Sequence, residues 1–217
     1  PLPSSAEGPG EDVSVQQGLA SAEPELDLDS QLRSGNFDLL ELGRRLDALG
    51  SDARVRLVRS LSGSAQAKLY EAAKGVRKMR LDDLVPADVP ALQEVVHEGK
   101  NSLPLFTHFA KVFCRPKGDG QEVWGYNRSG GFVQTVVGPG YFVAYEGPGD
   151  EVLIDYTRLP KGKVASWPEI LSNHDRLSRF VYAGMIDALR GVSSHVSVGR
   201  AIRNGKVQDN WFVLCRT

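Results

Sequence analysis

The residues of this chain best suited to nucleophilic chemistry are a cysteine and a histidine that lie far apart in the sequence. Cys114 ends an apolar run, and His195 precedes the last extended segments. A thiol becomes a nucleophile at neutral pH when a neighbouring imidazole takes its proton, and a carboxylate such as Asp155 or Asp175 can orient that imidazole. Cys114, His195 and Asp155 are therefore the candidate catalytic residues of a hydrolase or transferase. Cysteines in apolar runs more often act as small buried hydrophobes, so the sequence favours a protein that is not an enzyme.

The histidines do not form a local metal-binding motif. They are His97, His108, His174 and His195, and neither an HxH nor an HExxH arrangement occurs. Zinc sites are commonly recognised by such spacings, so we predict no metal ion and no cofactor. Cys114 and Cys215 are expected to be free buried thiols, although one long-range disulfide between them stays open.

Aromatic residues are concentrated between residues 122 and 157. Tyrosine and tryptophan combine apolar rings with polar tips, which suits a pocket that orients a mostly apolar ligand, and they suit an ordinary core as well. The predicted ligand-binding residues are Trp124, Tyr126, Tyr141, Tyr145, Tyr156 and Arg200. Asp155 lies in a strongly apolar run, so an inward-pointing Asp155 would need a partner such as Arg158, Arg200 or a tyrosine hydroxyl.

These side chains must be positioned by a sheet. Extended segments at 111–114, 122–127, 132–137, 141–146 and 152–157 are separated by turns rich in glycine or proline, which indicates an antiparallel meander. Residues 194–217 contain two extended runs joined at Asn204 and Gly205, which tolerate the positive φ values of a tight hairpin turn. The second run is apolar on both faces at 211–215, so it is predicted to be a central strand.

Between the meander and the hairpin, the sequence predicts one long helix over residues 173–190. Asn173 can cap it, and the apolar positions Leu177, Phe180, Val181 and Met185 recur at helical spacing. The predicted fold is therefore α+β, with a mainly antiparallel, curved sheet covered by this helix and preceded by a small helical bundle. The sequence leaves open whether the sheet curls around a cavity.

The predicted organisation has three parts. Residues 1–35, rich in Ser, Gly, Pro, Glu and Asp, are predicted to be a disordered acidic tail or linker. Residues 36–100 are predicted to be a helical segment, with helices near 36–50, 51–61, 62–74 and 90–97, and residues 101–217 are predicted to form the α+β body. The arginines at positions 44, 45, 54, 56 and 59 are expected to form the solvated face of the helices.

The net charge of −1 conceals a segregation along the chain. Residues 1–40 hold eight acidic residues and one basic residue, whereas residues 41–80 hold ten basic and four acidic residues. The basic block raises a helical adaptor for nucleic acid or protein as an alternative. Nucleic acid is disfavoured as a partner because the acidic tail balances the block and Tyr70 is its only aromatic residue.

No apolar run approaches the roughly 18 residues of a membrane span. The chain begins at Pro1 without an initiator methionine. A cytoplasmic location is favoured, and export after removal of a signal stays open.

One short segment resembles a known family. Ser197-Val198-Gly199-Arg200, followed by Trp211-Phe212-Val213-Leu214, is similar to the closing strands of the plastid lipid-associated fibrillins. The resemblance covers fewer than twenty residues and does not assign the chain to that family. It implies a lipocalin-like binder of apolar molecules.

The sequence therefore favours a soluble, non-catalytic binding or interaction module with an aromatic-lined pocket for an apolar or amphipathic small molecule. A protein partner in place of the small molecule stays open. The alternatives are an enzyme that uses the Cys114 and His195 pair and a helical adaptor.

Overall fold

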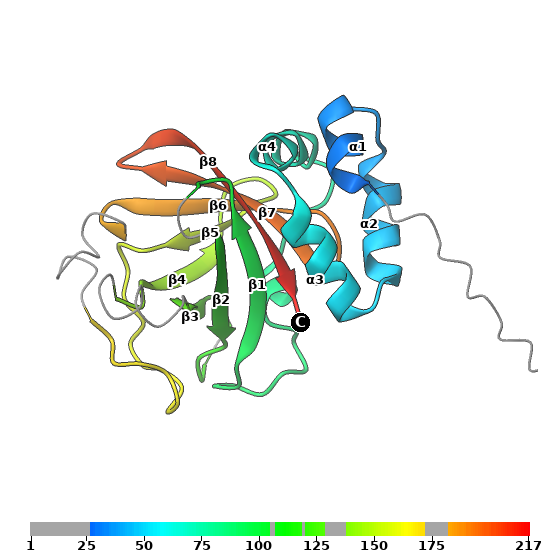
Figure 1. Ribbon diagram of the computed structural model, residues 1–217. Helices are drawn as coiled ribbons and strands as arrows, with labels where there is room; N and C mark the ends of the chain where they lie inside the picture. The colour runs from blue at the N-terminus through cyan, green and yellow to red at the C-terminus, as the bar shows by residue number, and fades with distance from the viewer. Residues whose placement is uncertain (1–26, 105–106, 119, 129–137, 172–181) are drawn as a thin grey trace, which may run out of the picture.

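In the computed structural model, residues 27–104, 107–118, 120–128, 138–171 and 182–217 are described. These residues form a closed antiparallel barrel of eight strands with four helices packed against one side (Figure 1). The strands are β1 (Val95–Asn101), β2 (His108–Cys114), β3 (Val123–Arg128), β4 (Tyr141–Glu146), β5 (Val152–Asp155), β6 (Met185–Gly191), β7 (Val196–Arg203) and β8 (Lys206–Arg216). The α+β class and the antiparallel sheet are confirmed.

The sheet closes because β1 pairs with both β2 and β8. The β1–β8 ladder places Gly99 opposite Leu214 and Lys100 opposite Val213. This strand occupies part of the segment that the sequence assigned to helices. The helix expected over residues 90–97 is wrong, because residues 90–94 form a turn and an irregular stretch and β1 begins at Val95. The alternating burial of Val95, His97 and Gly99 is the period-two pattern of a strand. A curved open sheet thereby becomes a barrel without a free edge.

The terminal hairpin and most of the meander are confirmed. Asn204 and Gly205 have φ values of 49° and 75°, as the turn between β7 and β8 requires. The strand expected over 132–137 lies outside the described residues.

The single long helix over residues 173–190 is not found. Its C-terminal part is β6, in which Met185 pairs with Arg203 and Leu189 pairs with Gly199. Residues 172–181 lie outside the described part of the chain. The alternation of Met185, Asp187 and Leu189 on the inner face is compatible with a strand, and the pairing of β6 with both β5 and β7 outweighs the helical spacing of the apolar residues.

The barrel interior is filled largely by aromatic and aliphatic side chains. Phe113 and Phe142 are completely buried, and their ring centroids lie 5.4 Å apart. Inward-facing glycines make room for such rings: a Cβ atom on Gly199 would lie 2.2 Å from the Phe212 ring, and one on Gly125 would lie 2.4 Å from the Phe142 ring. Small barrels often alternate small and large interior residues in this way.

Four helices cover the outer face of β7, β8 and β1. They are α1 (Leu28–Ser34), α2 (Leu39–Ala48), α3 (Ser51–Ser60) and α4 (Gly63–Ala72). Their leucines form one core with the outward-facing Val196, Val198, Val213 and Cys215. Helix α1 lies within the segment that the sequence predicted to be disordered, so that prediction is wrong for residues 28–34, and residues 1–26 are not described.

Arg54 was expected on the solvated face of the helices, and this prediction is wrong. Arg54 is only 5 % exposed, and its guanidinium donates to the backbone carbonyls of Leu46 and Leu49 at the end of α2. Arg56, two positions further on, is exposed as expected.

A fifth helix, α5 (Leu81–Leu84), covers the barrel end at which β1 begins. Leu81 and Leu84 belong to the interior core, and the His97 ring bonds to the Leu84 carbonyl. Strands β1, β3, β5 and β7 end at the opposite end of the barrel. Among the described residues, no helix is long and apolar enough to cross a membrane.

Candidate functional site

Four polar side chains meet inside the barrel and form what we call the interior polar centre. Its members are Lys111 of β2, Asn127 of β3, Asp187 of β6, and Tyr156, which directly follows β5. All four are at most 6 % exposed. Lys111 lies between Phe109 and Phe113 in a strand, so the alternation of side chains directs it into the barrel with those two rings.

The centre is a connected network. Lys111 Nζ lies 3.0 Å from Asn127 Oδ1 and 3.2 Å from Asp187 Oδ2, and it also contacts the Tyr156 hydroxyl. The Asn127 amide donates to the Tyr156 hydroxyl at 3.0 Å. Because the network joins four strands or their ends, the closed sheet fixes the geometry of each member.

Aromatic rings surround the ammonium group. Lys111 Nζ lies 5.0 Å from the ring centroids of Tyr156 and Phe212, 5.2 Å from that of Phe142 and 5.5 Å from that of Phe109. All four distances are within the range of cation–π attraction. The centre is therefore a polar group of one ion pair, one amide and one phenol inside an apolar, aromatic surrounding.

Burial shifts the pKa values of the centre towards neutral forms. It lowers the pKa of Lys111, an effect that the charge of Asp187 opposes. It raises the pKa of Asp187, an effect that Lys111 opposes. Burial and the charge of Asp187 hold the pKa of Tyr156 well above its usual value. Perturbed titratable groups of this kind are concentrated at functional sites, although structural ion pairs also show them.

Tyr182 covers the centre from the side away from α5. Its ring stacks on that of Tyr156, with centroids 5.1 Å apart and an interplanar angle of 14°. The ring also packs on Gly140, which precedes β4 and has a φ of 56°; a Cβ atom there would lie 2.4 Å from Tyr182. Burial raises the pKa of Tyr182 to about 12.

The residues predicted to bind a ligand are divided among three places. Tyr156 belongs to the interior polar centre. Tyr126 and Tyr141 lie on the outer face of the barrel, where they pack with Cys114 under Trp167, and Trp124 lies beside this cluster. Tyr145 stacks under the guanidinium of Arg158, and Arg200 stacks on Trp211 on the side of the helices.

The candidate catalytic residues are not brought together. Cys114 is buried in the outer cluster, and burial raises the pKa of its thiol to about 12, which suppresses the thiolate. His195 lies in the β6–β7 connection. The charged residues that interact with it are Arg54, Arg216 and Asp47. Asp155 accepts hydrogen bonds from the backbone and hydroxyl of Thr157 at 2.8 and 2.6 Å, and Asp175 is not among the described residues.

Sequence reasoning missed Lys111, Asn127 and Asp187. A signal existed for Lys111, because the strand Phe109-Ala110-Lys111-Val112-Phe113 places a lysine on the same face as two phenylalanines. Asp187 was missed because the sequence predicted a helix over its position. Both cysteines are free, and no group of three or more His, Cys, Asp or Glu side chains in the described ranges is arranged to hold a metal ion.

The chain was compared with protein-family models, with curated proteins and with solved structures, and none of the three comparisons found a match.

Proposed function

We propose that the barrel is a binding module that holds an amphipathic small molecule, with the polar head of the ligand at the interior polar centre and its apolar part among the surrounding rings. The observation that carries the proposal is the buried Lys111–Asp187 pair with its Asn127 and Tyr156 partners. A ligand head that accepts a hydrogen bond fits this centre by taking the place of Asn127, Tyr156 or Asp187 on one of the three donors of Lys111.

The energetics of the centre support the proposal. Burying two opposite charges costs several kcal/mol per ion, and replacing a buried ion pair by apolar residues is often neutral or stabilising. An interior built only for stability would therefore be served as well by aliphatic side chains. A polar centre inside an aromatic surrounding is the usual composition of a small-molecule site. An eight-stranded barrel has an interior that side chains can fill or that can hold one small ligand, so binding requires interior side chains to move.

Entry is proposed from the barrel end opposite α5. The α5 end is closed by Met79, Leu81, Leu84 and Val85, which are completely or almost completely buried. Tyr182 covers the centre from the other side, so a ligand reaching Lys111 displaces the Tyr182 ring from Tyr156.

The proposal is tested by titrating the protein with a fluorescent fatty acid and displacing it with an unlabelled fatty acid, a fatty alcohol and an alkane of equal chain length. The acid and the alcohol, which have a hydrogen-bonding head, are expected to compete, whereas the alkane is not. Lys111→Met, which keeps the length of the side chain, is expected to weaken binding at least about tenfold, which corresponds to roughly 1.4 kcal/mol.

Lys206→Met is the matched control because Lys206 is exposed in the β7–β8 hairpin. Thermal melts of both variants establish that each is folded. Equal affinity of Lys111→Met and the parent protein, or displacement by the alkane as effective as by the acid, contradicts the proposed site.

A further inference from the structure

A second candidate site lies at the other end of the barrel, beside α5. It is a small pocket, open to solvent on one side, between the segment before α5, strand β1 and the β6–β7 connection. The polar residues that line it include Arg77, Asp83, His97, Ser193, His195 and Ser197. None of these belongs to the interior polar centre.

Two buried polar atoms at this pocket have no partner among the described residues. They are His97 Nδ1 and Ser197 Oγ, on residues that are 2 % and 5 % exposed. Nearly all buried polar atoms in proteins are hydrogen-bonded, and an unpaired one costs about 1–3 kcal/mol. Two such atoms at one cavity indicate that a molecule in the cavity completes their hydrogen bonds.

The His97 ring defines what that molecule must offer. Its Nε2 lies 2.8 Å from the carbonyl oxygen of Leu84, and because a carbonyl only accepts, Nε2 carries the hydrogen. Burial lowers the pKa of His97 to about 4, so the ring is neutral at pH 7. Nδ1 is then an acceptor, and the ligand must donate a hydrogen bond to it.

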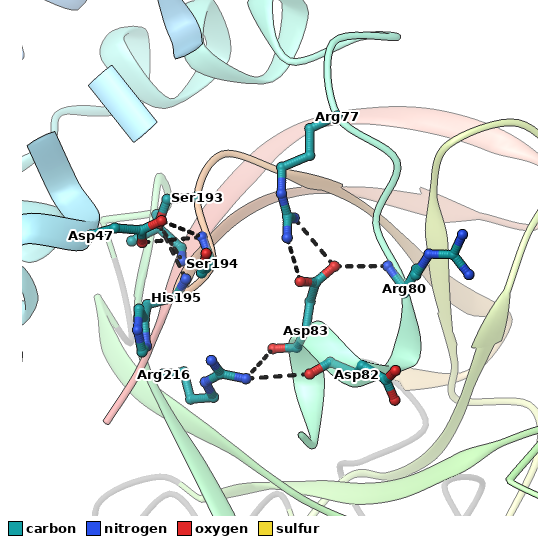
Figure 2. Close-up of polar contacts among 10 residues, drawn as sticks. Asp47, Arg77, Arg80, Asp82, Asp83, Ser193, Ser194, His195 and Arg216 are labelled. Carbon is teal, nitrogen blue, oxygen red and sulfur yellow. Dashed lines mark hydrogen bonds and ion pairs between the residues drawn. The ribbon is translucent and has the colours of Figure 1, made fainter. Parts of the chain in front are cut away.

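The charges around the pocket favour an anion. Arg77 donates to both carboxylate oxygens of Asp83, at 2.5 and 3.2 Å, so this pair is neutral overall (Figure 2). Arg216 donates instead to the backbone carbonyls of Asp82 and Asp83, and within the described residues no carboxylate forms a salt bridge with it. Arg216 therefore adds positive charge near the pocket from outside its lining, and the carboxylates of Asp83 and Asp47 offset part of that charge.

The β6–β7 connection and the start of β7 bring serine side chains to the pocket. The fold of the connection is fixed by Asp47, whose carboxylate accepts from the backbone N–H of Ser194 at 3.0 and 3.1 Å (Figure 2). The Ser193 hydroxyl oxygen accepts from the backbone of His195 and Val196, and its side chain also bonds to Asp47, so the Ser197 hydroxyl is the unpaired one at the pocket. Serine hydroxyls and guanidinium groups are typical ligands of phosphate oxygens.

We propose that this pocket binds an oxyanion that carries one hydrogen, namely monohydrogen phosphate. The P–OH group donates to His97 Nδ1, and the remaining oxygens accept from the Ser197 hydroxyl and from the Arg77 N–H groups that do not bond to Asp83. Arg216 acts as a nearby positive charge outside the pocket lining. Sulfate has the same shape but no hydrogen at neutral pH, so it leaves Nδ1 unpaired.

The test is calorimetric titration of the protein with inorganic phosphate and with sulfate at pH 7 and constant ionic strength. Phosphate is expected to bind at least about tenfold more tightly than sulfate. Ser197→Ala and Arg216→Gln are each expected to weaken phosphate binding by a similar factor. Arg44→Gln is the control, because the Arg44 side chain is 75 % exposed and lies on α2.

His97→Gln provides a sharper readout than affinity alone. The glutamine amide can turn a donor towards the pocket, so the preference for phosphate over sulfate is expected to disappear. A wild-type protein that binds neither anion, or both equally, overturns the proposal, as does unchanged phosphate binding by Ser197→Ala and Arg216→Gln. Fatty-acid binding by Ser197→Ala is expected to be unaffected, so the two proposed sites fail or succeed independently.

Discussion

The ammonium nitrogen of Lys111 lies 3.2 Å from a carboxylate oxygen of Asp187, although the two residues are 76 positions apart in the sequence. Only the closure of the barrel brings β2 and β6 into contact across the interior. The pair is completed by Asn127 and Tyr156, so each member of the centre has a hydrogen-bond partner within it. The residues of the proposed ligand site are therefore also residues whose contacts set the stability of the barrel interior.

The pair is expected to be strongly coupled. Lys111→Met or Asp187→Leu alone leaves one charge buried without its partner and is expected to cost about 3–5 kcal/mol of unfolding free energy. The double variant removes both charges and is expected to cost clearly less than the sum of the single changes. Guanidinium denaturation of the three variants measures this coupling. Additive single costs would show that the two side chains do not depend on each other.

Arg54 is expected to matter for stability although its neighbour does not. Arg54→Ala removes two hydrogen bonds to the carbonyls at the end of α2 and leaves those carbonyls buried, which is expected to cost about 1–3 kcal/mol. Arg56→Ala, on the exposed side of the same helix, is expected to change stability by less than about 0.5 kcal/mol. Equal thermal midpoints for the two variants would show that the Arg54 contacts contribute nothing.

His97 is expected to make the fold sensitive to acid. Burial lowers the pKa of this residue from 6.5 to about 4, so the folded state favours the neutral ring. The corresponding stability is complete above pH 6.5 and is lost as the pH falls towards 4, by roughly 3 kcal/mol over that interval. His97→Gln is expected to remove this part of the pH dependence, whereas replacing the exposed His108 by glutamine is not. Denaturation curves at several pH values between 4 and 7 decide the point, and parallel profiles of His97→Gln and the parent protein would refute it.

Neither cysteine is expected to react in the native protein. Burial raises the pKa of Cys114 to about 12 and that of Cys215 to about 11, and both side chains are completely buried. Iodoacetamide is expected to label neither thiol below about pH 8.5, and to label both in denaturant. Rapid native labelling of Cys114 at neutral pH would revive the enzyme hypothesis.

The sequence was most informative where local chemistry decides the structure. Asn204 and Gly205 specified the last hairpin because few residues adopt positive φ, and the glycine-rich turns marked β4 and β5. It was least informative where pairing between distant strands decides. Met185 and Leu189 have spacings that suit a helix, but β5 and β7 on either side supply the hydrogen bonds of a strand.

The functional residues followed the same division. Tyrosines and tryptophans attracted attention as ligand-binding residues, yet which face of a strand each occupies depends on register, and a shift of one residue reverses it. Tyr126 and Tyr141 face outwards to Trp167, whereas the less conspicuous Lys111 and Asp187 face inwards. His97 and Ser197 became recognisable only when α5 and the β6–β7 connection enclosed them.

The most direct test of the proposed ligand site is to locate a bound fatty acid by nuclear Overhauser contacts in solution. The account predicts contacts between ligand protons and the rings of Phe109, Phe142 and Phe212, which surround Lys111 inside the barrel. Contacts confined to Trp167, Tyr126 and Tyr141 on the outer face, with none to the interior rings, would contradict it.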